Sequence, residues 1–365
     1  MNFVNATVFT DKFEKTDVYV SDGKFADTAS GETVDLQGKY IIPGLIDIHT
    51  HGAVGTDTGA DDFDFGKWQK YLYSYGVTTF FPTTASMHMK DLRRVYKSLG
   101  ENGEIIGINL EGPYINAEKR GAHDIATLRP ASMEEFDELF EISKGKIKLT
   151  TIAPEIEGNT EFIKSVTEKY GITVSLGHST SDFETGKRAF EYGARQLTHT
   201  FNAMNQLLHR SPGLIGAAVL DENVNCEIIS DGIHVDKAMV KILYKLVGED
   251  RLILVSDSMS ATGLEDGHYT LSGLDVIVKD NIARTADGAL AGSTHNLMQM
   301  LRYAVSFGIP AESALKAATI NPAKAVKIDS ILGSIEKGKN ADFVVCDKDF
   351  NVYSVYKNGI QVYSI

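Results

Sequence analysis

Apolar runs of strand length alternate with longer, helix-length segments between residues 40 and 255 of the chain. Eight runs rich in Val, Ile and Leu have the length of a strand, at residues 40–48, 77–81, 105–110, 147–152, 172–176, 196–198, 225–229 and 251–255. Continuous apolar runs are typical of strands buried on both faces of a parallel sheet. Eight strands alternating with helices over about 250 residues match the size of a (β/α)8 TIM barrel. The pattern therefore predicts an α/β fold built on such a barrel.

The two ends of the chain have a different pattern, with short strand-like runs broken by Gly and Asp. These runs fill residues 1–43 and return in residues 333–365, where Asn358-Gly359 is a hairpin-type turn signal. Because the termini of a domain often lie close together, a large domain can interrupt a small one. We therefore expect one small β-sandwich domain from residues 1–43 and 333–365, and a barrel domain from residues 44–332.

Local signals predict three further elements. Ser132 to Glu135 resembles a capping box at the start of a helix, and residues 236–247 have a helical apolar period that ends before Gly248. Residues 264–290 interrupt the strand and helix alternation, because 269–271 and 276–278 have the pattern of an inserted hairpin. We expect this hairpin to cover part of the barrel mouth.

Composition narrows the class of protein. With 365 residues and 43% hydrophobic residues, the chain can bury a large core. Its net charge of -13 argues against nucleic acid or an anionic membrane as the main partner, and leaves room for a local basic pocket for one phosphate. Cys226 and Cys346 are far apart in apolar settings, so no disulfide or cysteine metal site is predicted. With no signal-peptide pattern and no membrane-length apolar run, we expect a soluble cytoplasmic protein that acts on a small molecule.

Polar residues with metal-binding or proton-transfer chemistry follow the predicted strands. They are His49 and His51 after the first, Glu111 after the third, His178 after the fifth, His199 after the sixth, His234 after the seventh and Asp257 after the eighth. The carboxyl ends of barrel strands meet at one mouth. These side chains are therefore expected to form one site.

The residue types favour a hydrolytic metal centre. Two imidazoles and a carboxylate form a three-ligand catalytic site that keeps an open position for water, and Glu111, His178 and His199 can supply this set. His49 and His51 are spaced to share one face of a strand, although two structural histidines at a turn would have the same spacing. A carboxylate beside such a centre can act as base and then as acid. Asp257 is our candidate, with a helix N-cap as the structural alternative.

The order of these residues resembles the amidohydrolase superfamily of metal-dependent hydrolases. Within it, several segments between residues 40 and 345 are similar to the N-acetylglucosamine-6-phosphate deacetylases. They are residues 110–114 (Leu-Glu-Gly-Pro-Tyr), 121–123 (Gly-Ala-His), 176–179 (Leu-Gly-His-Ser), 198–204 (Thr-His-Thr-Phe-Asn-Ala-Met), 231–234 (Asp-Gly-Ile-His), 255–259 (Val-Ser-Asp-Ser-Met), 290–293 (Leu-Ala-Gly-Ser) and 321–323 (Asn-Pro-Ala).

The resemblance implies a metal role for five residues. Glu111, in place of the lysine common in the superfamily, would hold the principal ion with His178 and His199. His49 and His51 would hold a second ion or line a site that works with one. The cofactor would be a divalent metal, one or two ions per subunit, with zinc preferred and iron, manganese and cobalt also suited to these ligands. The resemblance also implies a homodimer.

The resemblance further implies substrate contacts. His123 would contact the sugar or the acetyl oxygen. Arg210, His234 and the backbone N–H groups near Asn202 and Ala203 would bind the phosphate, with His234 acting within its subunit or across a dimer interface. Ser211 stands where the family has Glu. From the residues alone, a surface position would be preferred for His123, and a solvated surface charge is the usual state of a loop arginine such as Arg210. We assign no role to the other four histidines, His88, His209, His268 and His295.

The implied reaction is hydrolysis of the acetamide of N-acetyl-D-glucosamine 6-phosphate, in amino-sugar catabolism and cell-wall sugar recycling. Metal-bound hydroxide would attack the acetyl carbonyl, His123 would polarise the carbonyl oxygen, and Asp257 would protonate the leaving amine. An N-acetylgalactosamine-6-phosphate deacetylase, another amide hydrolase or a deaminase would share the metal site. A non-enzymatic barrel would be marked by loss of Asp257 or of a ligand, and all of these residues are present.

Overall fold

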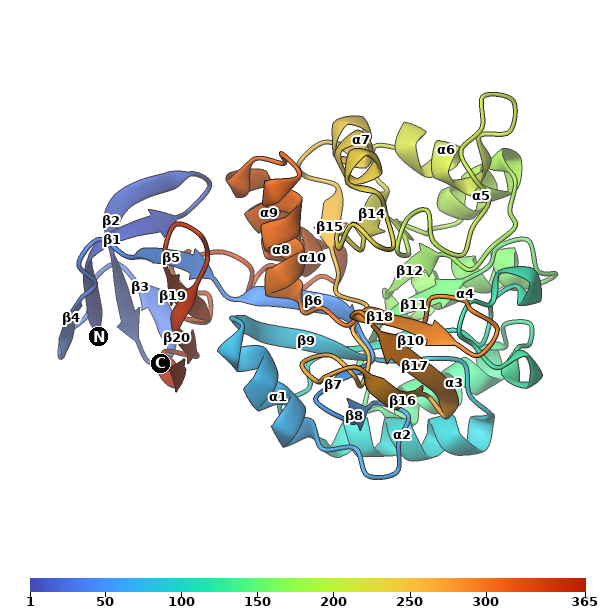
Figure 1. Cartoon of the computed structure of the whole chain (residues 1–365), viewed down its shortest axis with the longest axis horizontal. Coiled ribbons are helices and arrows are strands. Elements are labelled where there is room, and N and C mark those ends of the chain that lie inside the picture. Colours follow the sequence, from blue (N-terminus) through green and yellow to red (C-terminus); the bar gives the residue numbers. More distant parts are fainter.

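The barrel is the centre of the computed structural model, which describes residues 1–365 (Figure 1). Its strands, in the order in which they pair, are β6 (Leu45–Thr50), β9 (Val77–Thr84), β10 (Ile108–Glu111), β11 (Ile147–Ile152), β12 (Thr173–Leu176), β13 (Gln196–Leu197), β14 (Asn225–Ile228) and β15 (Leu252–Leu254). All neighbours are parallel. The last strand returns to the first just beyond its end, where His51 N donates to Ser258 O at 2.7 Å and Asp257 N to His49 O at 2.9 Å. The predicted barrel is confirmed, and each of its strands overlaps a predicted run.

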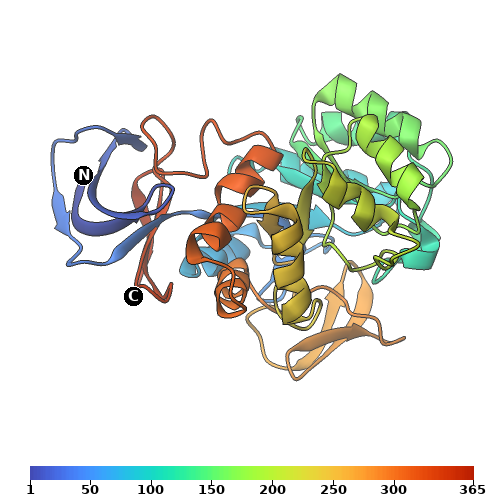
Figure 2. The same cartoon turned by 90° about the horizontal axis from the view of Figure 1, so that it is seen from above.

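Helices cover the outside of the barrel (Figures 1 and 2). They are α1 (Phe65–Ser74), α2 (Met89–Glu101), α3 (Met133–Ile142), α4 (Asn159–Tyr170), α5 (Phe183–Glu191), α6 (Gly213–Leu220), α7 (Lys237–Val247), α8 (Leu297–Ser306), α9 (Ala311–Ala318) and α10 (Ile320–Ala325). Asp236 caps α7, which ends before Gly248 as expected. At α3 the Ser132 side chain accepts from the backbone N of Glu135, which is half of the predicted capping box. No helix is long and apolar enough to cross a membrane.

Both ends of the chain contribute to one small sheet beside the barrel, seen at the left of Figure 1. Its strands are β1 (Asn2–Phe9), β2 (Phe13–Ser21), β3 (Lys24–Ala26), β4 (Thr33–Asp35), β5 (Tyr40–Pro43), β19 (Phe343–Cys346), β20 (Val352–Lys357) and β21 (Ile360–Ser364). Ile41 and Val345 point into the small core of this sandwich, whereas Ile42 and Val344 pack against the barrel core. The predicted β-sandwich is confirmed, and the exact domain boundaries stay a prediction.

The expected single strand over residues 40–48 is wrong. Tyr40–Pro43 pairs within the sandwich, and Leu45–Thr50 begins the barrel. Gly44 joins them at a point of close approach, because a Cβ there would lie 2.1 Å from Thr78 Oγ1. Residues 40–46 contain no charged residue, so the apolar pattern alone does not mark the change of sheet.

The insert after the eighth barrel strand has three strands, β16 (Gly267–Leu271), β17 (Leu274–Lys279) and β18 (Ile282–Thr285), where the sequence predicts two. Leu271, Val276 and Val278 pack with Ala122 and Met259 in a cluster of their own. Shorter elements near the mouth are β7 (Gly52–Ala53), β8 (Thr56–Asp57) and the 3-10 helices η1 (Ala117–Lys119) and η2 (Ile125–Thr127). Figure 2 shows the insert projecting beside the barrel.

Candidate metal centre

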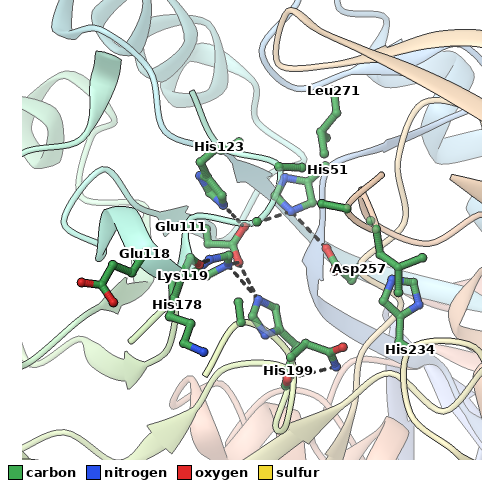
Figure 3. A pocket seen from close by; sticks show the side chains of 18 residues that line it. His51, Glu111, Glu118, Lys119, His123, His178, His199, His234, Asp257 and Leu271 are labelled. Atoms are coloured by element: carbon green, nitrogen blue, oxygen red, sulfur yellow. Dashed lines mark hydrogen bonds and ion pairs between the residues drawn. The ribbon is translucent and has the colours of Figure 1, made fainter. Parts of the chain in front are cut away.

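The polar strand ends meet around a cavity of about 320 Å³ at the barrel mouth (Figure 3). The predicted site residues that line it are His51, Glu111, His123, His178, His199, Asn202, Ala203, His234 and Asp257. Leu271 of the insert and Leu290 add apolar walls, so the insert does cover part of the site. His49 is fully buried beneath these residues, with its ring directed at Glu111.

Three of the residues predicted to bind metal or transfer protons have a backbone conformation that side chains rarely adopt. The φ angle is 49° at His178, 27° at His199 and 47° at Asp257. A non-glycine residue in this left-handed region costs about 1–3 kcal/mol, and such residues concentrate at functional sites. Each lies two or three residues beyond the end of a barrel strand, in the turn that directs its side chain to the cavity.

Glu111 is the common neighbour of five imidazoles. Its Oε1 lies 3.3 Å from Nε2 of His49, 3.2 Å from Nε2 of His178 and 3.0 Å from Nε2 of His199. Its Oε2 lies 3.2 Å from Nε2 of His51 and 3.5 Å from Nε2 of His123. A carboxylate in this position can bridge two groups of ligands.

Hydrogen bonds at Nδ1 orient three of the rings for metal binding. His178 Nδ1 donates to Lys119 O at 2.7 Å, and His51 Nδ1 donates to Thr83 O at 3.1 Å, because a carbonyl can only accept. His49 Nδ1 lies 3.0 Å from a Glu227 oxygen. A ring that donates from Nδ1 keeps the lone pair of Nε2 for a metal ion.

The spacing of the Nε2 atoms tests whether a divalent ion fits. Nε2 of His178 and Nε2 of His199 are only 3.0 Å apart. Burial lowers the pKa of His178 to about 4, so its ring is neutral and its Nε2 lone pair faces the other imidazole. His49 Nε2 is buried without a hydrogen-bond partner. The ligand atoms of Glu111, His123 and His178 lie within 4.8 Å of one another, as do those of His49, His51 and Asp257. His199 Nε2 lies 3.0 Å from Glu111 Oε1, so it adds a nitrogen to the first group, and imidazole and carboxylate groups of this kind suit a divalent cation.

Asp257 closes the cavity opposite Glu111. Its Oδ1 lies 3.2 Å from His51 Nε2 and 3.6 Å from His49 Nε2. Burial opposes ionisation of this carboxyl, but the neighbouring His51 and His49 rings outweigh it and lower the pKa of Asp257 to about 2. Asp257 is therefore an ionised proton acceptor. Asp257 is not a helix N-cap, because the next helix, α8, begins at Leu297 and is capped by Asn296. The N-cap alternative is therefore wrong.

His123 has the opposite ring orientation to the ligands. The backbone N–H of Ser86 donates to His123 Nδ1 at 2.9 Å, so the neutral ring carries its proton on Nε2. That N–H faces the cavity and can donate to a substrate oxygen. Gly112 makes room for this contact, because a Cβ there, at φ 70°, would lie 2.2 Å from Ser86 Oγ.

His234 also faces the cavity, held by Asp231, a residue to which the sequence analysis gave no role of its own. His234 Nδ1 lies 2.6 Å from Asp231 Oδ2, and Nε2 is buried without a partner. Burial lowers the pKa of His234, but the Asp231 carboxylate outweighs it and raises the pKa above its ordinary value. The free Nε2 is suited to an anionic group of a substrate.

Three of the four predicted phosphate contacts, His234, Asn202 and Ala203, line the cavity, and Arg210 lies outside it. Asn202 and Ala203 line the cavity, in the turn that follows His199. Arg210 is exposed on the following loop, forms no hydrogen bond or ion pair, and does not line the cavity. The structure therefore does not bring Arg210 to the other site residues of its own subunit, and its role stays a prediction.

Besides Asp231, the sequence did not point to three charged residues of the site, Glu118, Lys119 and Glu227. Lys119 lines the cavity from η1, in a loop that has no apolar period to anchor a prediction. Glu227 is buried in the middle of β14 and contacts His49. A charged residue within the apolar run 225–229 was a signal that it has a buried partner.

Comparison with known families decides the class of this site. The model of the amidohydrolase family matches residues 40–362, which is most of the chain. The chain belongs to the amidohydrolase family.

Among the amidohydrolase relatives are enzymes that act on two different sugars. The chain is 32% identical over 334 residues to the N-acetylgalactosamine-6-phosphate deacetylase of Escherichia coli O157:H7, covering 89% of this chain and 88% of the relative. It is 34% identical over 341 residues to the N-acetylglucosamine-6-phosphate deacetylase of Vibrio furnissii, covering 91% and 85%.

A solved structure shares the whole architecture. It is a mutant of the N-acetyl-D-glucosamine-6-phosphate deacetylase of Mycobacterium smegmatis in complex with N-acetyl-D-glucosamine 6-phosphate. The TM-score is 0.93 at 30% identity, and the match covers 100% of this chain and 99% of that one. The sandwich, barrel and insert are therefore all within the matched fold.

Proposed function

We propose that this amidohydrolase removes the acetyl group of N-acetyl-D-glucosamine 6-phosphate, giving D-glucosamine 6-phosphate and acetate in amino-sugar catabolism and cell-wall sugar recycling. The observation that carries the proposal is the meeting of three functions in one cavity: the Glu111–His178–His199 donor set, the ionised Asp257 and the Nε2–H of His123. The relatives named above act on sugar phosphates of this class, which supports the choice of substrate.

Glu111, His178 and His199 would hold the principal ion, and His49 and His51 would hold a second. A bound divalent ion would supply Lewis-acid polarisation of the acetyl carbonyl and would lower the pKa of water. Zinc is our choice among the metals that this donor set accepts. Elemental analysis of protein purified without added metal tests the identity of the ion.

Asp257 and His123 carry out the proton transfer and the stabilisation of the carbonyl oxygen. Asp257 accepts a proton from the water whose oxygen forms the new bond to the acetyl carbon. His123 donates from Nε2 to the carbonyl oxygen as negative charge develops there. Asp257 returns its proton to the sugar nitrogen as the C–N bond breaks, so the amine leaves neutral and the acetyl group becomes acetic acid. The acid then gives its proton to the solvent or to the amine and is released as acetate. One carboxylate thus serves as base and then as acid.

The phosphate is assigned to the side of the cavity formed by Asn202, Ala203 and His234. His234 Nε2 would donate to a phosphate oxygen, with Asp231 holding the ring. We also propose that the protein is a homodimer and that Arg210, exposed beside Leu207 and Leu208, reaches a phosphate from the rim or from a second subunit. Light scattering of the purified protein tests the dimer.

Steady-state rates on four sugars test the substrate. We expect kcat/KM to be highest for N-acetylglucosamine 6-phosphate, lower for N-acetylgalactosamine 6-phosphate, and lowest for the two sugars without phosphate. Equal values with and without phosphate would contradict the phosphate assignment. A higher value for the galactosamine epimer would favour the activity of the Escherichia coli relative instead.

A further inference from the structure

A second buried carboxylate lies directly beneath the metal ligands. Glu227 belongs to β14 and has no solvent exposure. Its Oε2 lies 3.0 Å from His49 Nδ1 and accepts from the backbone N of His199 at 3.1 Å. Its Oε1 accepts from Gln196 Nε2 at 2.5 Å. Glu227 does not line the cavity, so it cannot touch the substrate.

Every group that contacts the Glu227 carboxylate is a hydrogen-bond donor. Two of these donors, on His49 and His199, belong to the two different halves of the candidate metal centre. His49 pairs with His51 and Asp257, whereas His199 lies with His178. His49 depends on the carboxylate for its ring orientation, because Nδ1 must donate if Nε2 is to bind an ion. His199 Nδ1 has no partner of its own, so its backbone bond to Glu227 helps to fix its position.

We propose that Glu227 is a positioning residue that makes the His49–His51 half of the centre able to hold a second ion. By accepting from His49 Nδ1, it presents Nε2 as a ligand, and by holding the backbone of His199 it sets the spacing between the two halves. The inference rests on the proposed metal-dependent function, but it does not depend on which sugar is the substrate.

A merely structural role for Glu227 predicts something different. If its carboxylate only satisfied buried donors, its replacement would lower the free energy of unfolding and leave the ion count of the folded protein unchanged. The distinguishing readouts are therefore the number of bound ions and their affinity, measured on folded protein.

The test compares Glu227→Gln and Glu227→Met with the wild-type chain after loading with Zn²⁺ and dialysis. Gln keeps one acceptor oxygen, whereas Met keeps none at similar size. Glu155→Gln is the matched control, because Glu155 accepts from Ser179 and Thr180 beside the centre and contacts no imidazole. Zinc content is measured by elemental analysis, affinity by chelator competition, and folding by circular dichroism.

We expect two ions in the wild type and in Glu155→Gln, and a weakening of the weaker site by about 10–100-fold in Glu227→Gln. Glu227→Met should lose that ion, and Glu227→Gln should have no further effect on ion content when combined with His49→Ala. If Glu227→Met does not fold, Glu227→Gln decides alone. Unchanged affinity of both sites in a folded Glu227→Gln, or a single ion in the wild type, would overturn the proposal. Zinc retention with no deacetylation would instead count against the proposed function.

Discussion

The backbone N–H of Ser86 donates to Nδ1 of His123 at 2.9 Å. This one contact separates His123 from the histidines that are placed to bind metal, since those donate from Nδ1 and present Nε2 as a lone pair. His123 presents an N–H instead. The same residue type therefore serves two purposes in one cavity, and the partner of Nδ1 decides which.

Replacement of His123 tests its role as a donor. We expect His123→Ala to lower kcat by about 10²–10³-fold, the usual cost of removing one donor to a developing oxyanion. Zinc content should not change, because His123 Nε2 carries a proton and is not a ligand. The exposed His268 gives a control, since His268→Ala should leave both quantities unchanged. Loss of zinc in His123→Ala would show that the ring is a ligand after all.

Gly112 is predicted to be irreplaceable on steric grounds. In Gly112→Ala, the new Cβ would meet Ser86 Oγ, and φ of 70° adds strain of about 1–3 kcal/mol. We expect a lower melting temperature and a lower kcat, because Ser86 must move away from His123. Gly103→Ala is the comparison, since a Cβ at Gly103 meets nothing within 4 Å. Equal melting temperatures for the two variants would contradict the steric argument.

The Asp231–His234 pair predicts a pH dependence of substrate binding. Because the pKa of His234 is raised above 6.5, its charged form persists above the pH at which a free histidine loses its proton. Its contribution to stability is fully present below pH 6.5 and is lost as pH rises through the raised pKa. We expect KM for the phosphorylated sugar to increase over the same alkaline range. This increase should be absent in His234→Gln, and its persistence there would assign it to another group.

Removal of the metal is predicted to destabilise the fold. The Nε2 atoms of the buried His178 and His199 rings are only 3.0 Å apart. A bound ion would accept the lone pairs of both nitrogens and so remove the repulsion between them, which couples metal binding to folding. Binding to the folded state alone adds about 2.7 kcal/mol when the free ion is at 100 times its Kd. The melting temperature should therefore fall after treatment with a chelator and recover with added Zn²⁺. An unchanged melting temperature would mean that the ligands do not bind an ion.

The sequence predicted the barrel and the candidate ligands because both depend on a strong local pattern. Buried strands read as apolar runs, and a polar residue at the end of a run projects toward the mouth, as at His178 and Asp257. The roles of the histidines were not predictable in this way. They follow from the partners of Nδ1, such as Lys119 O for His178, and these come from segments far apart in the chain.

Other features escaped prediction for similar reasons. The break at Gly44 separates two sheets within one apolar run, and only the pairing of the two strands on either side reveals it. Glu227 contacts a residue 178 positions away, so local spacing carries no information on its partner. Arg210 was assigned from resemblance alone, and its exposed position leaves that assignment to experiment.

Asp257 is proposed to carry the proton in a metal-dependent deacetylation, and the variant Asp257→Asn removes this role alone. The measurement is acetate release from N-acetylglucosamine 6-phosphate, together with the zinc content of the same sample. We predict that kcat falls by about 10²–10⁴-fold or more while the zinc content stays at the wild-type value, because Asn keeps the shape but cannot accept the proton. Near-normal acetate release from the zinc-loaded variant would show that Asp257 does not carry the proton.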